Sequence, residues 1–333
     1  MNERTLPLQG LRVLLMVGIV LLHTYGNPIL GSGGELVSFF FVVSGFLYRD
    51  KLPWKTYVWK KSKALFPAYW LVLFLYCLKC IHAGGDVVKW AIISHLFLVQ
   101  SWIPYSGVDY AFSYVGVSWF LSSLMFCYIC SPVLFKLIQK ISQQKAFGGI
   151  LIAFMVVAMF HRFDGDNSYG LWFAYISPYC RVFEYLMGML LWRAIGEKSY
   201  KIISCGGEWI SLLCLFLYIS CISFRVLGSQ TCIIHILMIG YCYLYSSKLT
   251  NVFLANQLML WLAKYVMFVY LTHQALILHF DALREKTTEV FNALDISIGV
   301  LPFMFVYCWA FGIIFGIAYN KIYKLVCGKF ETK

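Results

Sequence analysis

Two residues that could do chemistry stand inside the first apolar stretch of the sequence, LQGLRVLLMVGIVLLHTYG. Arg12 and His23 are eleven residues apart, close to three whole helical turns, so both would lie on one helix face, about 16 Å apart along the axis. A neutral histidine can take a proton from a hydroxyl or act as a nucleophile, and an arginine attracts anions. Ionisable groups inside a membrane are costly and by default indicate function. An arginine that anchors the helix at the membrane boundary, together with a structural histidine, would give the same pattern.

Small and cationic residues follow in the next two apolar segments. Ser44 lies in FFVVSGF, where a serine beside a glycine either belongs to a site or permits two helices to pack closely. Lys60, Lys61 and Lys63 lie in WKKSKALFPAYW. Lysines at this place either keep a loop in the cytoplasm or attract the phosphates of a ligand as point charges.

Ionisable residues recur in later apolar segments. Arg181, Glu184 and Gly188 share a helix face at positions i, i+3 and i+7 of RVFEYLMG. The two charges either pair only with each other or orient groups beside a reaction centre. His273 follows Tyr270 by three residues, and on its own it is compatible with a hydrogen-bonded core histidine.

The elements that carry these residues must be membrane helices. Of the 333 residues, 61% are hydrophobic and 13% charged, and the mean hydropathy is +0.75, too apolar for a soluble surface. Runs near the length that crosses about 30 Å of hydrocarbon predict an all-α, polytopic protein with ten transmembrane helices in one membrane-embedded domain, residues 1–333. The predicted spans are 8–27, 35–48, 64–81, 116–138, 147–162, 171–195, 207–224, 230–247, 258–280 and 298–324.

The distribution of cations predicts the topology. A shorter run, 87–103, is interpreted as re-entrant or interfacial. With both termini in the cytoplasm, twenty of the 27 Lys and Arg residues then fall in inner loops or at inner helix ends, the positive-inside pattern. These loops account for the net charge of +12, so we expect no nucleic acid as a partner. The twelve cysteines lack metal-ligand spacing, so we expect no metal.

In their order, the motifs resemble those of the acyltransferase 3 family of integral-membrane acyltransferases. That family typically carries Arg-x10-His in its first helix, FFxxSGF in its second, a basic stretch before PxY, a W-x-L motif running to a proline, and a late YLxHxxL. Here the later motifs read FFVVSGF, WKKSKALFPAY, SWFLSSLMFCYICSP and YLTHQAL. The branch that modifies exported polysaccharides and lipid-linked glycans is the most similar. The sequence departs from the family at Ser38 and Leu124, where acidic residues are common, and at Ala64, where arginine is usual.

The resemblance implies an enzyme that transfers an acyl group, acetyl from acetyl-CoA or from another acyl-CoA, to a sugar hydroxyl within or across the membrane. It implies that Arg12 and His23 are catalytic, with His23 acting as a base or accepting the acyl group covalently. The implied partners are the acyl-CoA donor, a glycan or lipid-linked sugar as acceptor, and the bilayer, here the plasma (inner) membrane of a bacterium. The residues expected to bind substrate are Ser44, Lys60, Lys61, Lys63, Tyr69, Trp119, Arg181, Glu184 and His273.

Two other functions compete with this interpretation. A transporter or flippase for lipid-linked sugars also carries isolated charges around a central cavity, but the sequence has no detectable internal repeat. An oligosaccharide polymerase should have a large outer loop, whereas the longest predicted one, 82–115, is modest. The ordered motif set favours the acyltransferase.

Overall fold

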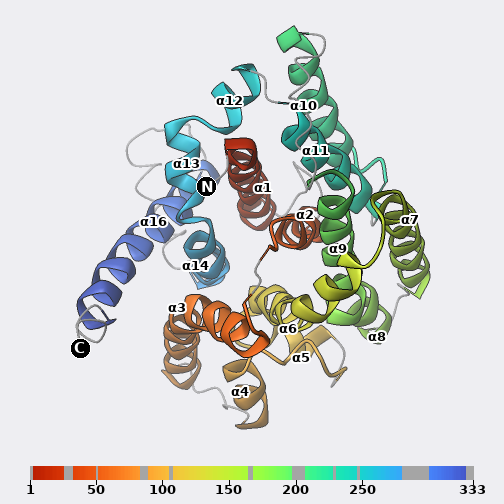
Figure 1. Cartoon of the computed structure of the whole chain (residues 1–333). Coiled ribbons are helices and arrows are strands. Elements are labelled where there is room, and N and C mark those ends of the chain that lie inside the picture. The colour runs from red at the N-terminus through yellow and green to blue at the C-terminus, as the bar shows by residue number, and fades with distance from the viewer. Residues whose placement is uncertain are drawn as a thin grey trace.

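The computed structural model describes residues 3–25, 33–49, 52–82, 89–104, 108–163, 168–196, 207–227, 230–245, 248–279 and 300–327. Within these ranges every regular element is a helix (Figure 1). The α-helices are α1 (Leu6–Tyr25), α2 (Gly33–Phe46), α3 (Trp54–His82), α4 (Lys89–Leu96), α5 (Val108–Phe112), α6 (Trp119–Gln139), α7 (Gln143–Phe160), α8 (Ser168–Leu171), α9 (Pro178–Leu191), α10 (Gly207–Ser223), α11 (Cys232–Leu244), α12 (Lys248–Leu254), α13 (Gln257–Ala263), α14 (Val266–His279) and α16 (Val300–Cys327).

Several of these helices can cross a membrane. Helices α1, α3, α6, α7 and α16 are long and apolar enough, and the α13–α14 pair passes the same test as one span bent by 63°. Helices α2, α10 and α11 are apolar but shorter. The chain is therefore an all-α, polytopic membrane protein, as its composition predicts. Each of the ten predicted spans contains a helix, whereas the count of ten crossings and the cytoplasmic side of the termini stay predictions.

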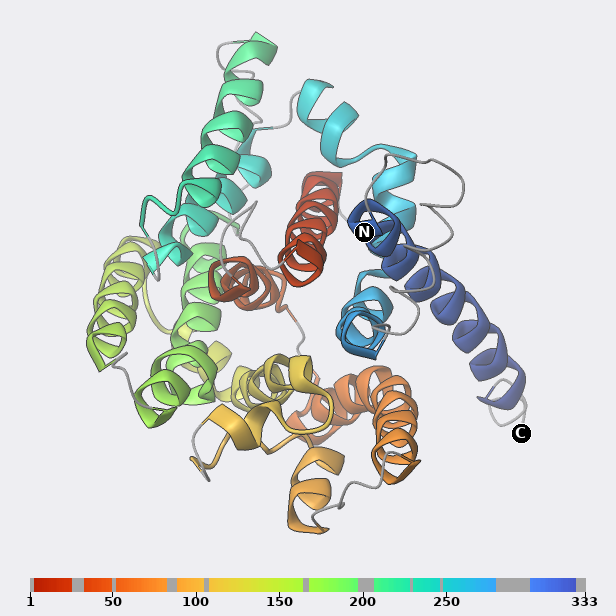
Figure 2. The same cartoon turned by 180° about the vertical axis from the view of Figure 1, so that it is seen from behind.

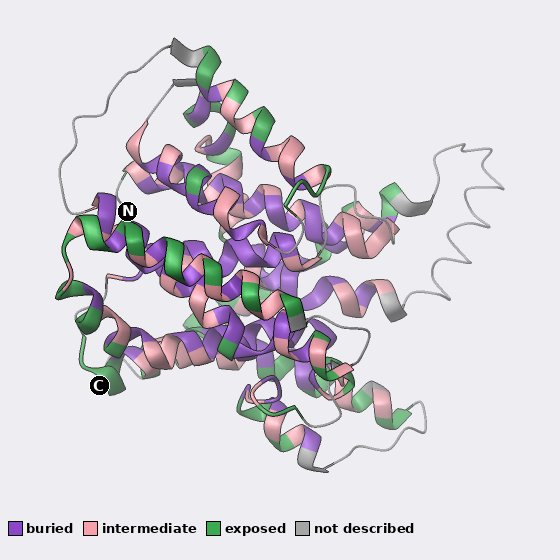
Figure 3. Ribbon diagram, turned by 90° about the vertical axis from the view of Figure 1, so that its right-hand side faces the viewer, coloured by how far each residue is buried: buried purple, intermediate pink, exposed green. Residues whose placement is uncertain are grey.

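Helices α1 and α2 form the centre of the molecule (Figures 1 and 2). Helix α1 packs against α2, α16 and the run α11 to α14, while α2 packs against α6, α9 and α11. Figure 3 shows that buried residues run through this centre and that exposed residues lie along the outer helices. Exposed side chains of α7 and α16 are largely apolar, such as Leu151, Met155 and Ile314, which suits contact with lipid.

Glycine permits the close crossing of α2 and α9. A Cβ atom on Gly45 would overlap the backbone carbonyl of Tyr185, and one on Gly188 would overlap that of Val42. Small residues let helix backbones approach in this way inside membranes. The packing interpretation therefore holds for Gly45, while its neighbour Ser44 faces open space between the helices.

Three predicted inner connections lie at the same end of the helices. Arg49, just after α2, lies over the ring of Trp192 at the end of α9. Arg193 donates a hydrogen bond to the carbonyl of Ile141, between α6 and α7. The ends of α2, α6 and α9 thus gather on one side, which agrees with the predicted alternation of loops.

The structure differs from the sequence prediction at the start of α3. This helix begins at Trp54, ten residues before the predicted span 64–81, so WKKSK forms helical turns instead of a loop. Lysines depress the hydropathy of a segment, so a span chosen by hydropathy leaves out these turns although the helix includes them. By contrast, α4 has only eight residues, about 12 Å of helix, so the interpretation of 87–103 as non-spanning agrees with the structure.

Candidate active site

Three cavities follow the face of α1 that carries Arg12, Met16, Ile19 and His23. The spacing of four, three and four residues shows that the predicted common face of Arg12 and His23 is present. We call these spaces the cationic cavity (about 390 Å³), the middle cavity (about 200 Å³) and the histidine cavity (about 240 Å³). The cationic and middle cavities share Arg12, Ser44, Lys61 and Tyr128 in their walls. The middle and histidine cavities share Val37 and Tyr270.

Three cations line the cationic cavity: Arg12 from α1, Arg49 after α2 and Lys61 from α3. In the described part of the chain no carboxylate lines it, and neither arginine forms an ion pair. The Cζ atom of Arg49 lies 3.3 Å from the ring centroid of Trp192, and its buried Nε has no acceptor among the described residues. Burial lowers the pKa of Arg49 below its ordinary value, but arginine titrates so high that it stays charged. This cavity is suited to an anionic group.

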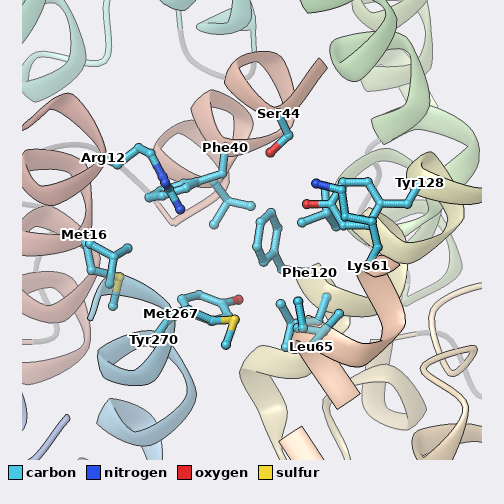
Figure 4. Close-up of a pocket in the computed structure, with 15 residues that line it drawn as sticks. Arg12, Met16, Phe40, Ser44, Lys61, Leu65, Phe120, Tyr128, Met267 and Tyr270 are labelled. Carbon is cyan, nitrogen blue, oxygen red and sulfur yellow. The ribbon is translucent and has the colours of Figure 1, made fainter. Parts of the chain in front are cut away.

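The middle cavity is mainly apolar. Figure 4 shows side chains from α1, α2, α3, α6 and α14 that point into one space, among them Phe40, Phe120 and Met267. Most of its polar groups adjoin the cationic cavity, where Lys61 Nζ lies 4.8 Å from the ring centroid of Tyr128, whereas Tyr270 adjoins the histidine cavity. Such a space can admit an extended, weakly polar chain.

Two histidines meet at the histidine cavity. His23 Nδ1 lies 2.8 Å from the carbonyl oxygen of Ile19, and His273 Nδ1 lies 2.8 Å from that of Tyr270. A carbonyl oxygen only accepts, so in the neutral rings each Nδ1 carries the proton and each Nε2 holds a lone pair. His273 Nε2 lies 3.3 Å from His23 Nδ1 and accepts part of that hydrogen bond. His23 Nε2 has no partner among the described residues, so it is the nitrogen that can take a proton.

An ion pair supports the aromatic wall of the histidine cavity. Arg181 donates through Nη1 to Glu184 Oε1 at 2.7 Å and through Nε to the carbonyl of Tyr175 at 2.7 Å. Its Cζ atom lies 5.8 Å from the ring centroid of Trp119 and 5.4 Å from that of Tyr175. Both rings line the cavity, whereas the two charged groups do not. Arg181 and Glu184 thus form the ion pair that the sequence allowed, and Arg181 also contacts the wall from its side away from the cavity.

Comparison with known families decides the class of protein. A family model described as an acyltransferase domain, acyltransferase 3, matches residues 7–322. The chain belongs to the acyltransferase 3 family. No curated protein and no solved structure gives a match. The chain is therefore a membrane acyltransferase, and its family favours this class over the transporter and the polymerase.

The acyltransferase brings most of the predicted site residues together. His273 contacts His23, and Arg181 with Glu184 lies behind the aromatic wall. The predicted residues that line the three cavities are Arg12, His23, Ser44, Lys61 and Trp119.

Three predicted residues of the acyltransferase stand apart from the cavities. Lys60 and Lys63 are exposed, because successive residues of α3 point about 100° apart and only Lys61 faces inward. Tyr69 is buried, and its hydroxyl lies 3.3 Å from Nδ1 of His95 in α4. Burial lowers the pKa of His95 to about 4, which keeps this ring neutral. The contact fastens α4 to α3.

Sequence reasoning missed several cavity residues of the acyltransferase, among them Arg49, Tyr128 and Gln274. Arg49 lies in a basic loop, where the positive-inside pattern already explains a cation. Tyr128 shares a helix face with Leu121 and Leu124, which also line the middle cavity, and this face could have been derived from their spacing. Gln274 directly follows His273, but its exposure to the cavity depends on how α14 is turned.

Proposed function

We propose that this acyltransferase transfers an acyl group, as acetyl from acetyl-CoA, to a hydroxyl of a sugar in a cell-surface or lipid-linked glycan of a bacterial plasma membrane. One observation carries the proposal. Cations, an apolar space and a histidine with an available Nε2 follow one another along α1. A coenzyme A thioester has the same order of groups: phosphates, a slender pantetheine arm and a reactive carbonyl. Arg12 and His23 are about 16 Å apart along the helix, a separation that suits the extended arm.

The phosphates of the donor bind in the cationic cavity. Arg12 and Arg49 offer planar guanidinium groups suited to bidentate contacts with phosphate, and Lys61 adds a point charge. This end carries the cytoplasmic loops of the predicted topology, and acyl-CoA is available on that side. Lys60 and Lys63 then act as topology signals and long-range attractors.

The arm of the donor passes through the middle cavity, so its thioester carbonyl meets the acceptor at His23. The hydroxyl oxygen of the sugar attacks the carbonyl carbon while His23 Nε2 takes the hydroxyl proton. The tetrahedral intermediate then expels the sulfur of coenzyme A, which leaves as a thiol after receiving the proton from His23. The new bond is an oxygen ester, and the broken bond is the thioester. His273 Nε2 accepts from His23 Nδ1 throughout, which holds the ring and its tautomer.

A covalent route would use the same nitrogen. His23 Nε2 would attack the thioester carbonyl, release coenzyme A and form an acyl-imidazole, which the sugar hydroxyl then attacks. Intact mass of the purified protein after donor alone distinguishes the two routes. A mass increase of one acyl group that is absent in His23→Gln indicates the covalent route, and an unchanged mass together with transfer indicates the general base.

The mass of surface glycans tests the whole proposal. Glycans from cells that contain the protein should be heavier by one acyl group per modified sugar than those from cells that lack it. Cells with His23→Ala should give the lighter glycans although the variant inserts and purifies as a monodisperse protein. Identical glycan masses with and without the protein would refute the sugar as acceptor.

Coenzyme A binding tests the donor half separately. We expect Lys61→Gln to weaken binding of coenzyme A, because Lys61 lines the cationic cavity. Lys63→Gln is the matched control, since it removes an exposed lysine from the same helix. Equal losses in the two variants would indicate only long-range attraction, and no loss in either would refute the phosphate site.

A further inference from the structure

Gln274 presents a buried amide oxygen beside the two histidines. Its side chain lines the histidine cavity together with His23, Trp119 and Tyr175. The Oε1 atom is buried and has no hydrogen-bond donor among the described residues. Leaving a buried amide oxygen unpaired is unfavourable, so an oxygen of this kind that lines a cavity is a candidate acceptor for a hydroxyl group of a ligand. No step of the proposed acyl transfer uses this amide.

Gly116 leaves the space that the amide occupies. A Cβ atom at this position would lie 2.7 Å from Gln274 Oε1 and 3.1 Å from Nε2. Gly116 begins the short helical turn Gly116–Ser118, whose Val117 carbonyl accepts a hydrogen bond from the hydroxyl of Tyr270 at 2.6 Å. Because Tyr270 and Gln274 are one turn apart on α14, this contact fixes the helix face that carries the amide. The Tyr270 hydrogen bond thus fixes the position of Gln274, and the missing Cβ atom of Gly116 leaves room for its amide.

The surroundings suit a sugar ring. The rings of Trp119 and Tyr175, with centroids 4.9 Å apart, offer flat apolar surface to the C–H face of a sugar, while the amide can both accept and donate a hydrogen bond. His23 and Gln274 line the same cavity of about 240 Å³, so a sugar ring bound there can contact both side chains.

We infer that Gln274 determines which hydroxyl of the acceptor is acylated, by binding the hydroxyl next to the one that faces His23. This inference rests on the proposed function and deepens it. Gln274 Oε1 accepts a hydrogen bond from one hydroxyl of a vicinal pair, and the other hydroxyl of the pair donates its proton to His23 Nε2. An acceptor without a neighbouring hydroxyl leaves the amide unpaired and reacts more slowly.

Two variants test the inference by different means. Gln274→Met keeps the length of the side chain and removes both polar atoms, whereas Gly116→Ala keeps the amide and pushes it aside. Gly148→Ala is the control, because a Cβ atom there meets nothing within 4 Å. The chain and its variants are expressed in cells that lack it, and the released surface glycans are analysed by NMR under mildly acidic conditions that suppress migration of the ester. Purified variants are measured for binding of coenzyme A.

We expect Gln274→Met and Gly116→Ala to lower glycan acylation by about 3- to 10-fold, the loss of one hydrogen bond, and to spread the ester over more than one hydroxyl. Binding of coenzyme A should stay within about twofold of the unmodified protein, since the cationic cavity is separate from Gln274. An ester at the same single position in both variants would overturn the inference. Coenzyme A binding that falls in step with acylation would also overturn it, because the amide would then be a structural group. Failure of the unmodified chain to acylate any glycan would instead refute the proposed function.

Discussion

The contact between the two histidines supports a quantitative prediction for His273→Phe. Phenylalanine fills the space of the imidazole but has no lone pair to accept from His23 Nδ1. When His23 takes a proton, that hydrogen bond becomes charge-assisted, and bonds of this kind contribute about 1.5–3 kcal/mol. A loss of this size corresponds to about a 10- to 150-fold slower reaction at about 1.4 kcal/mol per factor of ten. The carbonyl oxygen of Ile19 lies 2.8 Å from His23 Nδ1, closer than His273 Nε2 at 3.3 Å, and it still accepts a hydrogen bond in the variant. We therefore expect a loss of rate near the lower limit of this range.

Removal of the proposed base, His23, should lower the rate of acyl transfer further. General base catalysis contributes typically about 10²–10⁴ in rate, so His23→Ala should reduce transfer more than His273→Phe does. The order of the two losses is therefore the critical result. Thr272→Val is the control, because the hydroxyl of Thr272 is buried and bonds the backbone of its own helix.

Inverted membrane vesicles provide the assay, since the predicted cytoplasmic side then faces the added donor. Radiolabelled acetyl-CoA is supplied, and label in the glycan fraction is measured against the amount of protein. An unimpaired His273→Phe variant would refute the role of His273 in holding the base. A loss as large as that of His23→Ala would show that His273 takes a direct part in the chemistry.

Three further predictions concern topology, the donor and packing. In a cysteine-free background, a cysteine at Ser142 should resist an impermeant thiol reagent added outside intact cells, while one at Asn167, which lies outside the described residues, should react; labelling at Ser142 would overturn the predicted topology. Arg49→Gln should weaken binding of coenzyme A and lessen its dependence on salt, since dissolved salt screens the attraction between the cavity's cations and the incoming phosphates over about 8–10 Å at physiological ionic strength; unchanged affinity and salt dependence in calorimetry would argue against a phosphate site. Gly45→Ala should lower the melting temperature of the purified protein, because its Cβ atom would overlap the backbone of α9, whereas Gly148→Ala should not lower it; equal melting temperatures would refute the close crossing.

Features that depend on a single helix could be predicted from the sequence. The common face of Arg12 and His23 follows from the period of the helix, and so does the pairing of Arg181 with Glu184. The same period could have shown that Lys61 points away from Lys60 and Lys63, had the helical start of α3 been recognised. Hydropathy averages missed that start because the lysines that orient the protein also make the first turns look like a loop.

Contacts between distant helices could not be predicted in this way. His23 and His273 meet through the packing of α1 against α14, and Arg49 meets Trp192 only because α2 and α9 cross closely. Helix periodicity shows which side chains share a face of one helix, but it does not show which other helix packs against that face. The family resemblance indicated His273 as a site residue. It did not indicate which atom of His23 the ring would contact.

The apolar middle cavity has a consequence for the membrane as an electrical barrier. A membrane that stores energy as an ion gradient must exclude ions, and a protein with polar hollows at both ends of one helix face is at risk of becoming a leak. Phe40, Phe120 and Met267 line the space between those hollows, and moving a bare ion past such side chains costs many kcal/mol because nothing replaces its hydration. A neutral acyl chain meets no such obstacle. The middle cavity thus suits a neutral acyl chain while it obstructs the passage of ions.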